Sequence, residues 1–259
     1  MNNRRKKELI LSLGTLVVVI ILAVSYVLNS SSSIRTIANR EDVKMPIHSV
    51  NTDKKEIALS FDINWAEKDY LDDILIILNK YNVKATFFVM GKWITYTDDN
   101  KEKLNRIKEG GHEIGNHSYI HPNFSKLSNE KIEEEIMKTE KIIKDTVGVK
   151  SKLFRFPSGD YSESAVKKVL SLDYMPIQWD ADSVDWKEDG ETVEYERVRK
   201  KVKSGSIMLF HNNAKHTPSN LEKLIKELQS EGYEFKKVGD IIYNDGFYID
   251  SLGTQHKNL

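Results

Sequence analysis

Two histidines separated by three residues, His117 and His121, are the side chains whose spacing most directly points to chemistry. Neutral imidazole is the commonest protein ligand for zinc-like ions, and two such rings can share one ion where the backbone between them turns. Pro122 disfavours helical conformation at His121, so we expect the pair on a turn that follows a strand. Two surface or capping histidines are the competing interpretation, and only neighbouring motifs can favour one over the other.

Single polar residues also end two apolar runs. Asp62 directly follows residues 57–61 and His211 directly follows residues 206–210, and each run is typical of a buried strand. A carboxylate at the end of a strand can act as a base or a ligand, and an imidazole there can act as an acid. Taken alone, Asp62 could equally cap a loop, and a lone His211 is more often a structural histidine.

Two longer polar clusters are also spaced to follow strands. The Arg-Phe-Pro-Ser-Gly motif at residues 155–159 places an arginine that can pair with a carboxylate before a turn that can aim backbone N–H groups. Residues 182–186 supply two carboxylates and Trp186, an aromatic that could stack on a sugar face. An ordinary turn with a surface arginine is the alternative for the first cluster.

The elements that would position these residues alternate between short apolar runs and amphipathic helices. Ile132, Ile136, Ile143 and Val147, for example, place one apolar stripe on a helix that stops at Gly148. Repeated strand and helix units predict an α/β sheet or barrel with parallel strands, and such folds place their chemistry where strands end. The expected strands are residues 57–61, 85–90, 153–156, 175–179 and 206–210.

Composition excludes several functional classes. Lys+Arg and Asp+Glu each number 39, so no net charge draws the protein to nucleic acid. The chain has no cysteine, which excludes disulfides and thiolate metal sites and leaves His, Asp, Glu or Asn as metal ligands. At 259 residues, one catalytic domain with an appendage is the expected organisation.

The N-terminal segment has the pattern of a membrane anchor. Residues 1–8 contain a basic cluster, and residues 9–28 are uncharged and rich in Leu, Ile and Val. An apolar helix of this length spans roughly 30 Å, one hydrocarbon core. The positive-inside rule predicts a single-pass protein in the cell membrane, with a cytoplasmic N-terminus and an extracytoplasmic catalytic domain. A signal peptide cleaved near residues 23–25 is the alternative and would make the protein secreted.

The rest of the chain divides into a linker, a domain and a tail. Residues 29–54 contain four consecutive serines and predict a flexible linker. We expect the folded domain at residues 55–245 and a C-terminal tail at residues 246–259. No feature of the sequence indicates an oligomeric state.

Taken in order, the five polar clusters resemble the motifs of the polysaccharide deacetylases, the NodB-homology proteins of carbohydrate esterase family 4. The similarity covers roughly Lys55 to Tyr243, and His117-Ser118-x-x-His121-Pro122 is its most specific part. Residues 60–65, Ser-Phe-Asp-Ile-Asn-Trp, look most like the sporulation-associated PdaB-like branch. The resemblance implies an irregular (β/α) barrel with fewer complete units than a regular one.

The resemblance further implies a metal-dependent hydrolase that removes N-acetyl groups from an amino-sugar polymer, such as cell-wall or spore peptidoglycan. A divalent ion, Zn²⁺ or alternatively Co²⁺, would polarise the acetyl carbonyl and lower the pKa of its bound water. The implied roles are those of a general base (Asp62), a residue that orients the base (Arg155), two metal ligands (His117 and His121), a general acid (His211) and its tuning partner (Asp185).

Three further residues are implied to shape the substrate pocket. They are Ser158, whose N–H would bind the oxyanion, and Leu209 and Trp186, which would line the space for the acetyl methyl group.

One position departs from the family pattern. The family has a second Asp directly after the base as a third metal ligand, whereas this chain has Ile63, whose side chain cannot coordinate a metal. Asn64 offers an amide oxygen as a tentative substitute, provided that the strand has ended by that residue. Ser158 is a milder departure, since the family usually has an aromatic residue there. We therefore expect weak metal occupancy.

Ile63 also supports a competing function, a catalytically weak or inactive glycan-binding protein that acts in spore or envelope assembly. Hydrolysis of another acyl group, such as an ester, is a third interpretation. The acid and base residues are all present, and this favours an active deacetylase.

Overall fold

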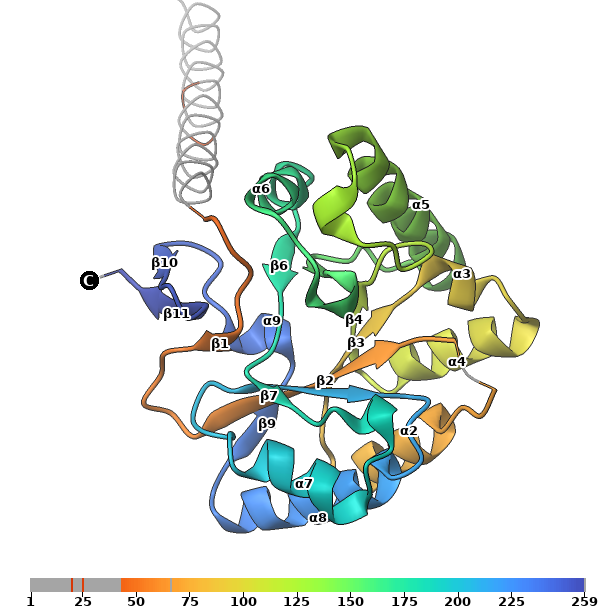
Figure 1. Cartoon of the computed structure of the whole chain (residues 1–259), viewed down its shortest axis with the longest axis vertical. Coiled ribbons are helices and arrows are strands. Elements are labelled where there is room, and N and C mark those ends of the chain that lie inside the picture. The colour runs from red at the N-terminus through yellow and green to blue at the C-terminus, as the bar shows by residue number, and fades with distance from the viewer. Residues whose placement is uncertain (1–19, 21–24, 26–42, 66, 259) are drawn as a thin grey trace, which may run out of the picture. The chain divides into compact units, whose positions relative to one another are not determined.

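The structure is a computed structural model that describes residues 20, 25, 43–65 and 67–258. The chain divides into two compact units, Met1–Asp42 and Val43–Leu259. Every helix and strand labelled in Figure 1 belongs to the second unit.

The centre of this unit is a curled parallel sheet, to which eight strands contribute within residues 43–258. The strand order across the sheet is β6-β5-β4-β3-β2-β8-β7, and β9 pairs with the beginning of β2. The strands are β2 (Glu56–Ile63), β3 (Thr86–Val89), β4 (Glu113–Asn116), β5 (Leu153–Arg155), β6 (Met175–Ile177), β7 (Ala181–Asp182), β8 (Ile207–His211) and β9 (Glu234–Lys236).

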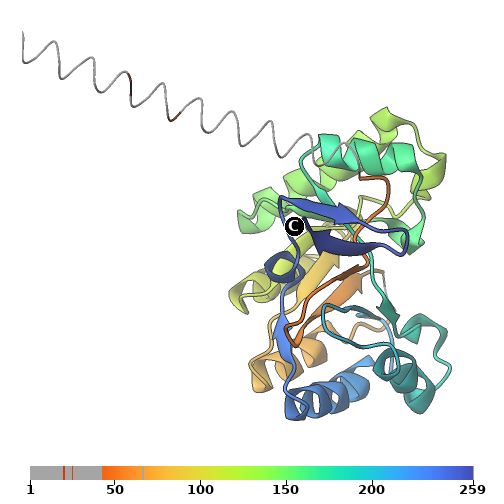
Figure 2. The ribbon, with the colours of Figure 1, turned by 90° about the vertical axis from the view of Figure 1, so that its left-hand side faces the viewer.

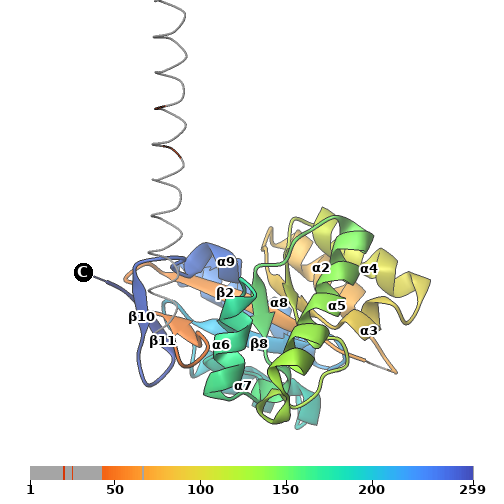
Figure 3. The ribbon, with the colours of Figure 1, turned by 90° about the horizontal axis from the view of Figure 1, so that it is seen from above.

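Helices surround the curled sheet in nearly the same order as its strands (Figures 1 and 3). Contacts join α6 to α5, α5 to α4, α4 to α2, α2 to α8 and α8 to α7, so these helices form one continuous layer. The helices are α2 (Leu71–Lys80), α3 (Gly91–Ile94), α4 (Asp98–Glu109), α5 (Asn129–Val147), α6 (Glu163–Ser171), α7 (Glu191–Arg199), α8 (Thr217–Ser230) and α9 (Val238–Ile241). Short 3-10 turns are η1 (Phe124–Lys126), η2 (Pro157–Gly159) and η3 (Asp185–Lys187).

The long helix α5 illustrates how local sequence sets these elements. Ser128 caps its N-terminus by accepting a hydrogen bond from the Lys131 N–H. Gly148 ends it at φ 69°, a left-handed conformation that glycine adopts without strain. Buried residues such as Ile132 and Ile136 recur at helical spacing and form one apolar stripe that faces the core.

Strand β2 separates an apolar layer from a polar one. The side chains of Leu59, Phe61 and Ile63 are fully buried in a hydrophobic cluster shared with α2, α4 and α8. Ser60 and Asp62 face the opposite side, because successive side chains of a strand alternate between its two faces. The sheet therefore presents the polar side chains of β2 to the inside of its curl.

The N-terminal end of the unit closes against the sheet. Ile47 forms a parallel bridge to Ile177 at the end of β6, and Ser49 forms an antiparallel bridge to Ser206 just before β8. The segment that contains Ile47 and Ser49 therefore joins the edge strand β6 to the region just before β8, near the opposite edge of the curled sheet.

A small second sheet joins the two ends of the unit. Strand β1 (Ser49–Val50) pairs with β11 (Thr254–Lys257), and β11 pairs with the antiparallel strand β10 (Phe247–Ile249). Figure 2 faces this sheet and shows the C-terminal strands in dark blue.

These contacts correct the expected domain boundaries. The folded unit begins at Val43, so the second half of the predicted linker at residues 29–54 is folded, and Val43, Ile47 and Val50 are buried. The predicted tail at residues 246–259 contains β10 and β11. Strands β10 and β11 are three and four residues long and form a short hairpin, and β11 also pairs with the distant β1, so neither strand is long enough to show an alternating pattern in the sequence.

The half-barrel of parallel strands confirms the coarse form of the predicted fold, an α/β architecture of the NodB-homology type. The predicted transmembrane segment at residues 9–28 lies outside the described residues, except for Ile20 and Ser25. In the part of the chain that the structure describes, no helix is both long enough and apolar enough to span a membrane.

Candidate active site

The polar motifs meet at the carboxyl ends of the parallel strands. Asp62, near the end of β2, lies level with His211 at the end of β8. Arg155 ends β5 and His117 directly follows β4, while Asp185 lies in the turn η3 after β7. Side-chain contacts connect these five residues into two groups, one around Arg155 and one around Asp185.

Arg155 holds the buried carboxylate of Asp62. The guanidinium is fully buried, and its Nη1 donates to Asp62 Oδ1 at 2.9 Å. Nη2 donates to Ser60 Oγ at 2.8 Å and to the Gln178 carbonyl at 3.0 Å, so several acceptors share its charge. The ring of Phe88 lies 4.0 Å from the guanidinium carbon. Sequence reasoning did not identify Ser60 or Gln178 as parts of this site.

The pKa of Asp62 is the outcome of opposing effects. Burial alone would raise the pKa, but electrostatic interactions with His117, Arg155 and His211 and the hydrogen bond from Arg155 hold it below its ordinary value. Asp62 is therefore ionised at neutral pH and able to accept a proton.

His117 presents an unprotonated nitrogen to Asp62. Its Nδ1 donates to the Arg155 carbonyl at 2.9 Å, and this fixes the tautomer that leaves Nε2 as an acceptor. Burial lowers the pKa of His117 to about 4, so the ring is neutral at physiological pH. Nε2 is buried without a hydrogen-bond partner among the described residues and lies 3.4 Å from Asp62 Oδ2. Two acceptors that face each other in this way suit a cation between them.

His121 lies on a tightly built turn beside His117, and the two ring centroids are 5.0 Å apart. Ser118 N–H donates to Asn116 Oδ1, and His121 N–H donates to Ser118 Oγ. Ser118 and His121 adopt φ values of 66° and 61°, which non-glycine residues rarely do and which cost about 1–3 kcal/mol each. Burial lowers the pKa of His121, so this imidazole also favours its neutral form.

Glu135 of α5 secures the same turn from outside. Its Oε2 accepts hydrogen bonds from the Tyr119 and Ile120 N–H groups at 2.8 and 2.9 Å. Neither Glu135 nor Asn116 was identified from the sequence. An Asn before the first histidine is a local turn signal that could have revealed the second of them.

The second group orients His211. Asp185 Oδ1 accepts from His211 Nδ1 at 2.7 Å, while Oδ2 accepts from the His211 N–H at 2.9 Å and from Thr217 Oγ1 at 2.5 Å. Burial would lower the pKa of His211, but the hydrogen bond to Asp185 and the charges of Asp185, Asp62 and Asp182 raise it above its ordinary value. Thr217, the first residue of α8, is therefore a positioning residue for Asp185.

The predicted pocket residues lie on the same strands and turns. Leu209 is buried on β8, two residues before His211 and on the same face. Trp186 is 58% exposed beside Asp185, and Ser158 is exposed in η2 with φ 53°. Asp182 serves the loop instead, because it accepts hydrogen bonds from the Val184 N–H and from Trp179 Nε1.

Ile63 and Asn64 lie in different surroundings at the end of β2. Strand β2 continues through Ile63, which pairs with Val89 and is buried in the apolar layer. Strand β2 ends at Ile63, so Asn64 lies outside the strand. This is what a substitute metal ligand at position 64 requires. Its Oδ1 is buried without a hydrogen-bond partner among the described residues.

The donor atoms therefore fit a divalent cation incompletely. Two neutral imidazoles, a carboxylate and an orphaned amide oxygen suit a zinc-like ion. However, the described residues contain no group of three or more His, Cys, Asp or Glu side chains arranged to hold a metal. Ile63 stands at the position of the family's third carboxylate ligand, and its side chain is buried in the apolar layer.

A parallel half-barrel with an ionised carboxylate and a carboxylate-paired histidine at its strand ends defines the class of α/β-barrel hydrolases. The family model for polysaccharide deacetylase matches residues 49–177. The chain is 31% identical to the peptidoglycan-N-acetylmuramic acid deacetylase PdaA of Bacillus subtilis (strain 168), over 78% of this chain and 77% of PdaA. The chain therefore belongs to the polysaccharide deacetylase family, carbohydrate esterase family 4, which confirms the predicted class of enzyme. Its placement in a PdaB-like branch stays a prediction.

Other similar proteins include one that is described as a pseudoenzyme. The chain is 36% identical to the Bacillus subtilis protein YlxY, over 76% of this chain and 60% of YlxY. It also matches BA3943, a carbohydrate esterase family 4 pseudoenzyme from Bacillus anthracis, with a TM-score of 0.72 and 31% identity over 83% of this chain and 74% of that chain. A BA3943 mutant with restored enzymatic activity has the same TM-score.

Proposed function

We propose that this protein removes N-acetyl groups from an amino-sugar polymer by hydrolysis at the Asp62 and His211 site. The observation that carries the proposal is the opposite tuning of these two groups on adjacent strands. Arg155 helps to keep Asp62 ionised, whereas Asp185 raises the pKa of His211 and so favours its protonated form. A base and an acid with separated pKa values, side by side, are what amide hydrolysis requires.

Each residue has a role in this proposal. Asp62 takes a proton from the attacking water, and Arg155 keeps its carboxylate oriented. The Ser158 N–H stabilises the oxyanion, a contact whose loss costs on the order of 100-fold in rate. His211 then gives its proton to the departing amine nitrogen, and Leu209 and Trp186 enclose the acetyl methyl group.

His117 and His121 would hold a divalent cation, with Asn64 as a tentative third ligand. Zn²⁺ is the expected ion and Co²⁺ the alternative, and the bound ion would supply Lewis-acid polarisation of the acetyl carbonyl. The chain itself contributes two neutral imidazoles, one of them held in its ligating tautomer by the Arg155 carbonyl.

The relatives support peptidoglycan as the polymer, since PdaA is named a peptidoglycan-N-acetylmuramic acid deacetylase. The basic residues 1–8 and the apolar residues 9–28 support a cell-membrane protein whose catalytic domain faces the cell wall. The PdaB-like pattern at residues 60–65 supports a role in sporulation.

Acetate release from peptidoglycan and from N-acetylglucosamine oligomers tests the activity. The wild-type protein should release acetate, and Asp62→Asn and His211→Ala should each reduce the rate by at least about 100-fold. Equal rates in all three proteins would contradict the assigned mechanism. Chromogenic acetyl esters assayed in parallel would show whether esters are preferred to amides.

A second candidate function is glycan binding with weak or absent hydrolysis in spore or envelope assembly. The burial of Ile63 in the apolar layer favours it, because the usual third carboxylate ligand is missing. The structural similarity to a pseudoenzyme also supports it. Glycan binding without acetate release, in the presence of added Zn²⁺ or Co²⁺, would establish this alternative.

A further inference from the structure

A pair of exposed aromatic rings stands beside the catalytic strands. Trp65 and Tyr96 are 45% and 56% exposed, and their ring centroids are 4.0 Å apart with an interplanar angle of 59°. Trp65 lies in the loop between β2 and α2, and Tyr96 lies in the loop between α3 and α4. Aromatic rings left in contact with water are candidates for ligand contact.

The two rings form the wall of a pocket with a polar floor. The pocket has a volume of about 270 Å³ and is also lined by Trp93, Asn100 and Lys103. Asn100 is oriented by a hydrogen bond from its Nδ2 to the Trp93 carbonyl at 2.7 Å. Aromatic walls with a few oriented polar groups are typical of small-molecule sites.

Ion pairs fix the polar side of the pocket. The Lys103 side chain is only 11% exposed, and its Nζ lies 2.9 Å from Asp69 Oδ2 and 3.2 Å from Asp99 Oδ2. All three side chains line the pocket. With Glu67, which also lines the pocket, three carboxylates face one ammonium group, so the pocket offers hydroxyl groups several acceptors and one donor and would repel an anionic ligand.

The pocket is tied directly to the catalytic strand through Asn212, which follows His211. Asn212 is fully buried, accepts from the Asn64 N–H at 2.9 Å and donates to the Asn64 carbonyl at 3.3 Å. It also donates to Asp69 Oδ1 at 3.0 Å. One amide thus connects the end of β8, the backbone next to Trp65 and Asp69 of the pocket. A ligand in the pocket would therefore be held at a fixed position relative to the catalytic site.

We propose that the Trp65 and Tyr96 pocket binds one sugar ring of the glycan chain, beyond the ring directly next to the one that is deacetylated. The inference rests on the proposed function, which it deepens by assigning polymers and not single amino sugars as substrates. A pyranose has an apolar C–H face for the rings and hydroxyls for Asp69, Asn100 and Lys103. The pocket volume suits a single ring, whereas a protein partner would need about 800 Å² of surface.

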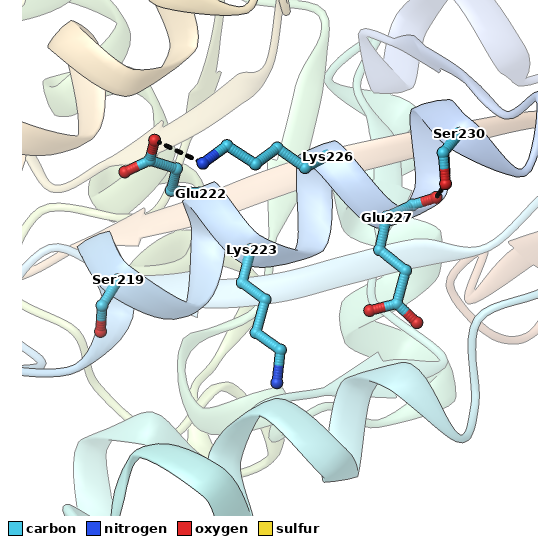
Figure 4. Close-up of a pocket in the computed structure, with 6 residues that line it drawn as sticks. All are labelled: Ser219, Glu222, Lys223, Lys226, Glu227 and Ser230. Carbon is cyan, nitrogen blue, oxygen red and sulfur yellow. Dashed lines mark hydrogen bonds and ion pairs between the residues drawn. The ribbon is translucent and has the colours of Figure 1, made fainter.

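A groove along α8 offers a contrast. Its volume is about 510 Å³, and Figure 4 shows the six side chains that line it. Lys226 Nζ lies 3.1 Å from Glu222 Oε1, and Glu227 accepts from Arg199 Nε at 2.7 Å. Its charged groups largely satisfy one another, and no aromatic ring lines it, so we assign it no ligand.

Binding of N-acetylglucosamine oligomers tests the pocket independently of catalysis. We would measure the affinity of the dimer and the hexamer by calorimetry in an Asp62→Asn background, with Trp65→Ala or Tyr96→Ala added. Each added change should weaken hexamer binding by about tenfold, equivalent to about 1.4 kcal/mol, and dimer binding by less than about twofold. Trp65→Phe keeps an aromatic ring and should retain most of the hexamer affinity.

Tyr248→Ala is the matched control. Tyr248 is 53% exposed and stacks on His256 with a centroid distance of 4.8 Å, so it too is a surface aromatic in a ring pair. It lies on β10, on the other side of the molecule from α3 and α4 (Figures 1 and 3). Neither oligomer should bind more weakly to this variant.

The outcomes separate the pocket from the proposed function. Equal weakening of dimer and hexamer by Trp65→Ala, or no weakening of either, would overturn the pocket, provided that thermal melting shows a folded variant. A wild-type protein that releases no acetate, yet binds the hexamer in a Trp65-dependent way, would support the pocket and contradict the hydrolysis.

Discussion

The backbone carbonyl of Arg155 accepts a hydrogen bond from Nδ1 of His117 at 2.9 Å. The same arginine donates through its guanidinium to Asp62. One residue at the end of β5 thus sets the tautomer of a candidate metal ligand and the orientation of the candidate base. A side-chain substitution at Arg155 should release Asp62, whereas the backbone carbonyl that accepts from His117 is retained.

Removal of the Arg155 charge should destabilise the fold. Arg155→Met leaves Asp62 buried without its partner, and we expect the free energy of unfolding to fall by about 3–5 kcal/mol at pH 7. The pKa of Asp62 is depressed in the folded state, so its stabilising contribution is present above its unfolded pKa and is lost as the pH falls through the folded value. The difference between the two proteins should therefore shrink in acid.

Urea unfolding from pH 7 to pH 3 measures this difference, and Lys167→Met is the control. Lys167 forms an exposed ion pair with Glu163, which should contribute less than about 1 kcal/mol. Similar losses of stability in the two variants would show that the Arg155 pair behaves as a surface pair does.

The pairing of His211 with Asp185 should set the alkaline limb of the pH profile. Because the pKa of His211 is raised, the general acid keeps its proton at pH values above the ordinary histidine pKa of about 6.5. Asp185→Asn should lower kcat and move the alkaline limb of kcat/KM to lower pH. An unchanged limb would assign the titration to another group.

The same pair makes a prediction for stability. A histidine whose pKa is higher in the folded state than in the unfolded state stabilises the fold. The contribution is complete at pH values below the pKa of the unfolded state, and it is lost as the pH rises through the pKa of the folded state. Asp185→Asn should therefore lower the melting temperature more at pH 6 than at pH 9. A loss that does not depend on pH would point to hydrogen bonding alone, such as the bond from Thr217.

New carboxylates at Ile63 and Asn64 should have different effects. Ile63→Asp restores the family carboxylate but puts its charge where Ile63 packs in the apolar layer, so it should cost about 3–5 kcal/mol of stability and tighten Zn²⁺ binding only if the end of β2 rearranges. Asn64→Asp puts the same group just past the end of β2, where Oδ1 of Asn64 is buried without a hydrogen-bond partner among the described residues, and should tighten Zn²⁺ binding by about tenfold, equivalent to about 1.4 kcal/mol. Thermal melting and calorimetric Zn²⁺ titration of both variants check this, and tighter binding by Ile63→Asp would show that the end of β2 rearranges.

Metal affinity in the wild-type protein should be low. Without the second family carboxylate, Zn²⁺ or Co²⁺ should bind more weakly than to a relative that retains it, and His121→Ala should remove most of the binding. Chelator competition gives the affinities. A tight, stoichiometric complex in the wild-type protein would contradict the expected effect of Ile63.

The motif residues could be predicted from the sequence because each cluster is local. Residue types at the ends of apolar runs indicated Asp62, Arg155, His117, Asp185 and His211, and the half-barrel has them at strand ends. The positioning residues could not be found in this way. Glu135, Thr217 and Asn212 act through contacts with segments that are remote along the chain, and their residue types are ordinary for helices and turns.

The sequence by itself determined which chemical groups are present, their order, the parallel α/β class and the missing carboxylate at Ile63. Only the tertiary structure decided which groups meet and which way they face. The direction of Ile63 depends on where β2 ends, and the pairing of Arg155 with Asp62 depends on the curl of the sheet. Both are consequences of packing between distant segments, and the energy of such packing leaves no periodic pattern in the local sequence.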